Sequence, residues 1–311
     1  MRERQSDVIL KEFWRINDRF ADLFNTVVFG GKCVLKAEEL QEMDTDVSSV
    51  IDMKEYRQTL SRTRDVVKKT AGGIDFMIIG IESQKKIHYG MPLRHMIYDA
   101  MGYLKEYEQL TYQYKKEKKK GTVDEFLSKM KKEDRLHPII TLTIYYGEKR
   151  WDGPHSLKDM IIEMPKEVEK VFSNYHMNLL EVRNSGSYQF HNEDVQTVFE
   201  LSRETFDGKF EEIRKKYQEK KLTPELLEVI GTIVGSKELV HMKEDKEVDS
   251  MCTALDRLKE ESKMVGLKEG RQEEQKNRIS IMLEKGYPIS EISLIFQLSE
   301  EEIIKLTESR K

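Results

Sequence analysis

The sequence predicts a mixed α/β protein in which helices pack on a sheet. Two nearly continuous apolar runs, residues 74–81 (IDFMIIGI) and 138–146 (PIITLTIYY), adjoin glycines and are rich in isoleucine or in β-branched and aromatic residues, as is typical of buried strands. A stretch with helical spacing, residues 91–114, lies between them, and residues 176–184 (HMNLLEVRN) have the pattern of a further short strand. Strands that alternate with long connections favour one layered sheet flanked by helices.

Before the first strand, the pattern predicts mostly helix. Apolar side chains recur every three or four positions over residues 7–29, which predicts one amphipathic helix that ends at Gly30-Gly31. We expect a short turn and helix at residues 35–40 (LKAEEL) and a second helix at residues 47–62 (VSSVIDMKEYRQTLSR). After the second strand, residues 156–161 (SLKDMI) begin another helix.

The remainder of the chain has helical patterns. Residues 195–238 predict amphipathic helices, and residues 243–278 are so dense in Lys and Glu that we expect a solvated helix with coiled-coil character. Two or three short helices follow over residues 279–308, and Ser299 with Glu302 fits a capping box for the last of them. The predicted domains are therefore a core at 1–185, a helical extension at 186–242, and a charged helix with small C-terminal helices at 243–311.

Composition excludes several classes of protein. The 311 residues include 53 Lys and Arg against 57 Asp and Glu, a formal net charge of -4, so the chain is not a globally basic nucleic-acid coat, although a local basic face is compatible with it. Two cysteines without a CxxC motif exclude a disulfide scaffold and a Cys-rich zinc site. Because neither a signal peptide nor an apolar stretch of membrane-spanning length is found, we expect a soluble, cytoplasmic protein with no membrane partner.

Candidate chemistry gathers around the first predicted strand. Asp65 precedes Val66-Val67, while Glu82 stands where the apolar run 74–81 stops and Gln84 follows two positions later, on the same side of an extended chain. If the segment at Asp65 pairs with this strand, two carboxylates and an amide meet at one sheet edge, an oxygen-rich arrangement that suits Mg²⁺. Acidic residues at strand ends are also commonly solvated or cap turns, so this pattern alone leaves both interpretations open.

Several longer segments of the sequence are similar to the motifs of a known protein family. The stretch GIDFMIIGIESQKKIHYGMPLRHMIYDAMGY contains an Ile-Glu-x-Gln strand end and then Met91-Pro92-Leu93-Arg94 with Tyr98. Arg64-Asp65 lies upstream, PIITLTIYYGEKRWDGP downstream, and NDRFADLFNTVVFGG near the start. Together these segments, within roughly residues 15–240, resemble the recombination-promoting nuclease and transposase-like (YhgA-like transposase) family, a branch of the PD-(D/E)xK nucleases.

The resemblance implies a restriction-endonuclease-like central mixed sheet flanked by helices, and a Mg²⁺-dependent DNA endonuclease that has little sequence specificity and promotes recombination. Asp65 and Glu82 would bind Mg²⁺, or Mn²⁺ as a substitute, and the three catalytic positions would be Asp65, Glu82 and Gln84. The wider superfamily usually has lysine at the third position, where its charge assists the attacking water. Gln84 lacks that charge, although its amide can orient a water.

Supporting roles and alternatives follow from the same residues. Arg94 and Tyr98 are one turn apart on the predicted helix, where they would hold the DNA backbone and support the site, or else form a surface ion pair and a packing contact. Asp18 is a further acidic candidate or a solvated residue. The alternative function is a catalytically weak or inactive DNA-binding or regulatory protein on a nuclease fold. Glu300–Glu302 would repel phosphates, so we interpret the C-terminal helices as a packing or homodimer-forming module.

Overall fold

The described part of the chain forms a mixed α/β structure with a five-stranded sheet, which confirms the α/β class predicted from the sequence. The structure is a computed structural model and describes residues 3–42, 66–70, 75–81, 87–116, 121–217, 220, 222–236, 239–240 and 251–308. It divides into two compact units, Met1–Met251 and Cys252–Lys311. The predicted helix at 47–62 lies outside the described residues.

The sheet has the order β1-β2-β3-β4-β5, with the strands β1 (Leu40–Glu42), β2 (Val66–Thr70), β3 (Asp75–Ile81), β4 (Ile139–Tyr145) and β5 (Asn178–Glu181). The first three strands are antiparallel, whereas β3, β4 and β5 are parallel. Three of these strands were expected from their apolar runs, and β2 agrees with the short strand at Val66-Val67 that was expected to pair with the first of them. The three-residue β1 was not, because the segment 35–40 suggested a short helix and only a single 3-10 turn, Ala37–Glu39, forms there.

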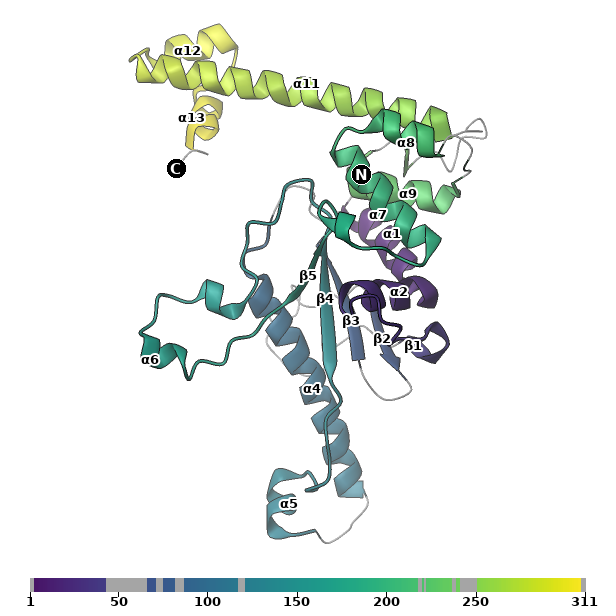
Figure 1. The fold of residues 1–311 in the computed structure, drawn as a ribbon. Coiled ribbons are helices and arrows are strands. Elements are labelled where there is room, and N and C mark those ends of the chain that lie inside the picture. Colours follow the sequence, from purple (N-terminus) through teal and green to yellow (C-terminus); the bar gives the residue numbers. More distant parts are fainter. Residues whose placement is uncertain are drawn as a thin grey trace. The chain divides into compact units, whose positions relative to one another are not determined.

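Helices cover both faces of the sheet (Figure 1). The crossover between β3 and β4 contains α4 (Met91–Lys116) and the short α5 (Val123–Ser128). On the other face lie α1 (Glu3–Arg15) and α2 (Asn17–Val27), against which α7 (Glu193–Phe206) and α9 (Pro224–Val234) pack. The first unit also contains α6 (Lys166–Glu169), α8 (Phe210–Tyr217) and two further 3-10 turns, Leu157–Met160 and Ser185–Ser187.

The prediction of one helix over residues 7–29 is wrong at Ile16, where the backbone is extended between α1 and α2. A buried lysine of β2 explains the break, because the Lys68 ammonium donates to the backbone carbonyl of Arg15 and to the side-chain oxygen of Asn17. The Asn17 amide in turn donates to the carbonyls of Ala37 and Leu40. Lys68 thus satisfies a carbonyl at the end of one helix and fixes the start of the next.

Arg19 ties the helices of the first unit together. Its side chain is 6% exposed, and its guanidinium donates to Asp194 at 2.7 Å and to Glu225 at 2.5 Å, in the first turns of α7 and α9. It also lies 4.4 Å from the ring centre of Phe13. One side chain of α2 therefore joins three helices that are far apart in sequence.

The second unit is a small helical bundle formed by the end of α11 (Met251–Glu284) with α12 (Ile289–Phe296) and α13 (Glu300–Glu308). Its core is Ile279, Ile292 and Ile303. The predicted capping box is confirmed, since the Ser299 amide donates to Glu302 at 2.8 Å and the Glu302 amide donates to the Ser299 hydroxyl at 3.3 Å.

Candidate functional site

Four strands of the sheet end or begin at one edge. In the β3–β4 ladder Ile81 lies beside Tyr145, and in the β4–β5 ladder Tyr145 lies beside Glu181. β2 begins at Val66, which pairs with Ile78 three positions before the described end of β3. We call this side of the sheet, defined by Val66, Ile81, Tyr145 and Glu181, the C-terminal edge.

α4 begins close to the C-terminal edge. His95 bonds to the hydroxyl of Thr143, and one turn later Asp99 accepts from the hydroxyl of Thr141 at 2.6 Å. The later residue of α4 contacts the earlier residue of β4, so the helix runs antiparallel to the strand. The first turn of α4 therefore lies near the C-terminal end of β4. This arrangement brings Arg94, in the first turn of α4, toward the edge.

Arg94 has hydrogen-bonding capacity left over. Its Nε atom is buried and has no hydrogen-bond partner among the described residues. Burial, and after it the positive charge of Arg94, lowers the pKa of His95 to about 4, and the same two causes lower the pKa of His88. Arg94 as a whole is partly exposed, and the other N–H groups of a guanidinium are suited to an anion such as a phosphate.

A buried polar network anchors α4 to the sheet. Asp99 accepts hydrogen bonds from Thr141 and from the hydroxyl of Tyr175, which belongs to the connection between β4 and β5. Burial, and after it the charge of Asp99, raises the pKa of Tyr175. Because the three groups satisfy one another away from water, they fix the position of the helix that carries Arg94.

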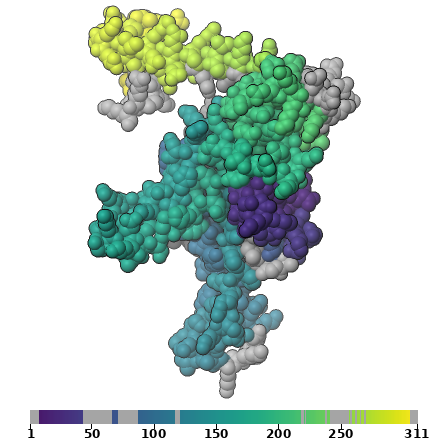
Figure 2. Space-filling view, in the orientation of Figure 1, coloured from purple at the N-terminus to yellow at the C-terminus, as the bar shows by residue number. Residues whose placement is uncertain are grey.

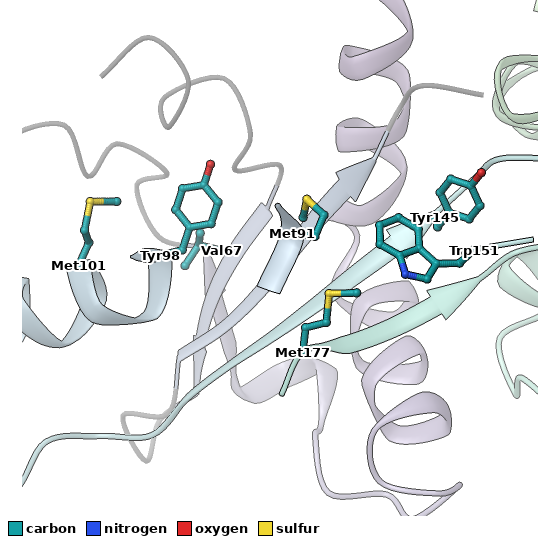
Figure 3. Close-up of a cluster of buried hydrophobic side chains, with 7 residues drawn as sticks. All are labelled: Val67, Met91, Tyr98, Met101, Tyr145, Trp151 and Met177. Atoms are coloured by element: carbon teal, nitrogen blue, oxygen red, sulfur yellow. The ribbon is translucent and has the colours of Figure 1, made fainter. Parts of the chain in front are cut away.

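Tyr98 lies in the hydrophobic layer between α4 and the sheet (Figure 3). The side chain is fully buried among residues drawn from β2, α4 and the strands β4 and β5 with their flanking segments. The members of this cluster are Val67, Met91, Tyr98, Met101, Tyr145, Trp151 and Met177. Of the two roles expected for Tyr98, the structure shows the packing contact, and support of the DNA-binding site stays a prediction.

Two acidic residues at the C-terminal edge were not singled out from the sequence. Glu181 ends β5 and accepts from the backbone N–H of Trp151 at 2.7 Å, and Asp152 accepts from the hydroxyl of Tyr89 at 3.4 Å. Burial, followed by the charges of Glu181 and Asp152, raises the pKa of Tyr145. In the sequence, Glu181 has the same feature as Glu82, since each acid stands where an apolar strand stops. That β3 and β5 both lie beside β4 is known only from the order of the strands in the sheet.

The main predicted site residues, Asp65, Glu82 and Gln84, lie outside the described residues. In sequence, Asp65 directly precedes Val66 and Glu82 directly follows Ile81. Asp18 is exposed in the first turn of α2, a helix on the face of the sheet opposite to α4, so the structure does not bring it together with Arg94. Within the described ranges, no group of three His, Cys, Asp or Glu side chains could hold a metal ion.

Comparison with known proteins adds no relative. No protein-family model matches the chain, and no curated protein or solved structure matches it either. Among the helices in the described part of the chain, none combines the length and the apolar character needed to cross a bilayer.

Proposed function

We propose that this chain is a cytoplasmic, Mg²⁺-dependent DNA endonuclease that hydrolyses phosphodiester bonds with little sequence specificity and promotes DNA recombination. The observation that carries the proposal is the C-terminal edge. The start of β2 and the end of β3, next to which Asp65 and Glu82 stand in the sequence, belong to the same edge as the first turn of α4 with Arg94. The mixed sheet flanked by helices also supports a restriction-endonuclease-like fold.

In this proposal, each candidate residue has a separate task. Asp65 and Glu82 hold the metal, which when bound lowers the pKa of a water and offsets negative charge on the phosphate. Gln84 orients the attacking water through its amide. Arg94 donates a guanidinium N–H to a phosphate oxygen, and the contacts of His95 and Asp99 with β4 hold its helix in place.

A second candidate is a DNA-binding or regulatory protein that uses the same edge without cleavage. The observation that favours it is Gln84, since the neutral amide stands where the superfamily usually has a positive charge. The two candidates share the DNA contacts of Arg94 and differ in whether Asp65 and Glu82 support hydrolysis.

Cleavage of supercoiled plasmid in Mg²⁺ or Mn²⁺ separates the candidates. We expect the wild type to nick or linearise the plasmid and Asp65→Ala and Glu82→Ala each to lower the rate by roughly a hundredfold or more, because removal of a group that stabilises transition-state charge commonly costs about that much. Glu108→Ala is the matched control, since this exposed acid lies on α4 far from the C-terminal edge. A wild type that shifts DNA on a gel but is inert in both metals would favour the binding protein.

Arg94→Ala tests the phosphate contact separately. A hydrogen bond to a charged group contributes roughly 1.5–3 kcal/mol, so we expect DNA binding to weaken by about ten- to a hundredfold. Binding is measured by fluorescence anisotropy with a duplex in Ca²⁺, so that cleavage does not interfere. If affinity is unchanged while the fold is intact, Arg94 does not contact the backbone.

A further inference from the structure

An arm extends from the first unit at the end opposite to the C-terminal edge (Figure 1). Its described residues are 103–116 and 121–138, which are the second half of α4, the short α5 and the segment that returns to β4 (Figures 1 and 2). The hydroxyl of Tyr107 donates to the carbonyl of Ser128 at 2.6 Å, and the backbone N–H of His137 donates to Glu106 at 3.0 Å. These contacts hold the returning segment against α4, so the arm is an ordered part of the fold.

α5 presents an apolar face that no described residue covers. Its Val123, Phe126 and Leu127 are 74%, 71% and 72% exposed. Positions i, i+3 and i+4 of a helix share one face, so these three side chains form a continuous patch. A capping box of Thr122 and Glu125 fixes the start of the helix and therefore the direction of the patch. Such a contiguous exposed patch, unlike scattered apolar residues, is typical of an interaction site.

We infer that this face of α5 binds the same face of a second copy of the chain, around a two-fold axis that makes the two helices antiparallel. The charges at the ends of α5 fit this partner. Asp124 is exposed in the first turn and Lys129 is exposed immediately after the last, and neither forms an ion pair within the described part of the chain. In an antiparallel pair, the acidic end of each helix lies at the basic end of the other, so the surface is complementary to itself.

The same features argue against DNA as the occupant of this face. Asp124 and Glu125 flank the apolar patch and would repel phosphates. α4 has 26 residues and is therefore about 39 Å long, and it separates α5 from the edge where Arg94 lies. The inference does not depend on the proposed nuclease activity. It is also separate from the predicted association through the C-terminal helices, because α5 and α13 belong to different units of the chain.

The apolar face of α5 is small, and this limits the affinity of the dimer. Three side chains per copy cover much less than the roughly 800 Å² per partner that is usual for stable complexes. We therefore expect a weak, reversible dimer with a Kd of about 1 µM to 1 mM. Two such helices bring the apolar side chains together at the centre and place the charged ends at the rim, as in ordinary interfaces.

Sedimentation equilibrium of the full chain, from about 1 µM to about 1 mM, tests the inference over the expected range of Kd. The wild type should approach the mass of a dimer, and Phe126→Asp should raise the Kd at least tenfold. Asp124→Lys should also weaken the dimer, because it places lysines from the two copies together. Adding Lys129→Glu to that variant should restore the wild-type Kd, which identifies the antiparallel arrangement.

Two control variants locate the interface. Ile162→Asp changes another strongly exposed apolar residue, in the connection between β4 and β5, and should leave the Kd unchanged. Leu294→Asp changes an exposed residue of α12 and should also have no effect. The inference is overturned if the wild type stays monomeric over the whole range, or if Phe126→Asp leaves the Kd of the dimer unchanged. A dimer lost in Asp124→Lys but not restored by the charge exchange overturns the antiparallel pairing.

Discussion

Replacing Arg19 with methionine should destabilise the first unit far more than the same change at Arg15, although both arginines form two ion pairs. Arg19 is 6% exposed and bonds to Asp194 and Glu225, whereas Arg15 is 48% exposed and pairs with Glu12 at 2.7 Å and Glu42 at 3.0 Å. Methionine keeps much of the apolar stem in both cases. The difference between the two variants therefore reports the charged hydrogen bonds.

The expected magnitude follows from burial. Breaking a fully buried ion pair costs roughly 3–5 kcal/mol, because the remaining partner stays buried without its counter-charge. Asp194 and Glu225 are 40% and 49% exposed and regain water when Arg19 is removed, so the cost must be reduced. Adding the cation–π contact with Phe13, worth about 0.5–1 kcal/mol, we expect Arg19→Met to lower the free energy of unfolding by about 2–3 kcal/mol. Arg15→Met should lower it by about 0–1 kcal/mol.

Urea unfolding followed by tryptophan fluorescence measures this difference in the right part of the chain. The two tryptophans, Trp14 and Trp151, are both buried in the first unit, so the signal does not follow unfolding of the second. When combined with Arg19→Met, Asp194→Asn and Glu225→Gln should each restore part of the lost free energy of unfolding, because each removes a carboxylate that has lost its counter-charge. If Arg19→Met and Arg15→Met agree within about 0.5 kcal/mol, the usual effect of a surface substitution, then burial does not strengthen these pairs.

Three further predictions concern buried groups. The pKa of His95 is about 4 in the folded chain and about 6.5 when unfolded, so the unfolded state binds more protons between these values and stability falls as pH drops from 6.5 to 4. Compared with the wild type, His95→Gln should remove a dependence of about 3 kcal/mol from urea unfolding curves over that range, and equal slopes for the two proteins would contradict this. Burial lowers the pKa of Lys68 below 10.5, so its contribution to stability rises with pH between the lowered pKa and 10.5; Lys68→Met should flatten the unfolding free energy measured at alkaline pH. Gly231→Ala would place a Cβ 2.6 Å from that of Leu239 and should cost about 1–3 kcal/mol in thermal unfolding, whereas Gly266→Ala, with open space around it, should be neutral or slightly stabilising.

Elements with a strong local signal were predictable. The strands β3, β4 and β5 and the helix α4 follow from apolar runs and helical spacing, and the structure confirms them within a few residues. The helix expected at 156–161 is only a 3-10 turn over Leu157–Met160. Its backbone is instead tied to a distant segment, since Leu157 donates to the carbonyl of Tyr175 at 2.8 Å.

Features that depend on distant partners were not predictable. The break at Ile16 is stabilised by Lys68 of β2, which lies about fifty positions later in the sequence. The candidate site also combines a residue that has a local sequence signal with partners that have none. Arg94 was proposed from a local motif, but the neighbours that hold its helix, Thr141, Thr143 and Tyr175, come from another strand and a connection. Their sequence contexts contain nothing that marks them as partners of α4.

The order of the strands also bears on solubility. Residues 75–81 (DFMIIGI) have the composition of an aggregation-prone segment, since they are apolar, β-forming, free of proline and bear one charge. In the fold this strand is β3, which is hydrogen-bonded on one side to β2 and on the other to β4, so its backbone is not available to another chain. The outer strands β1 and β5 are only three and four residues long and offer little for intermolecular pairing. A truncation that removes β1 and β2 would uncover one side of β3, and we expect it to lower the soluble yield even though α4, β4 and β5 remain.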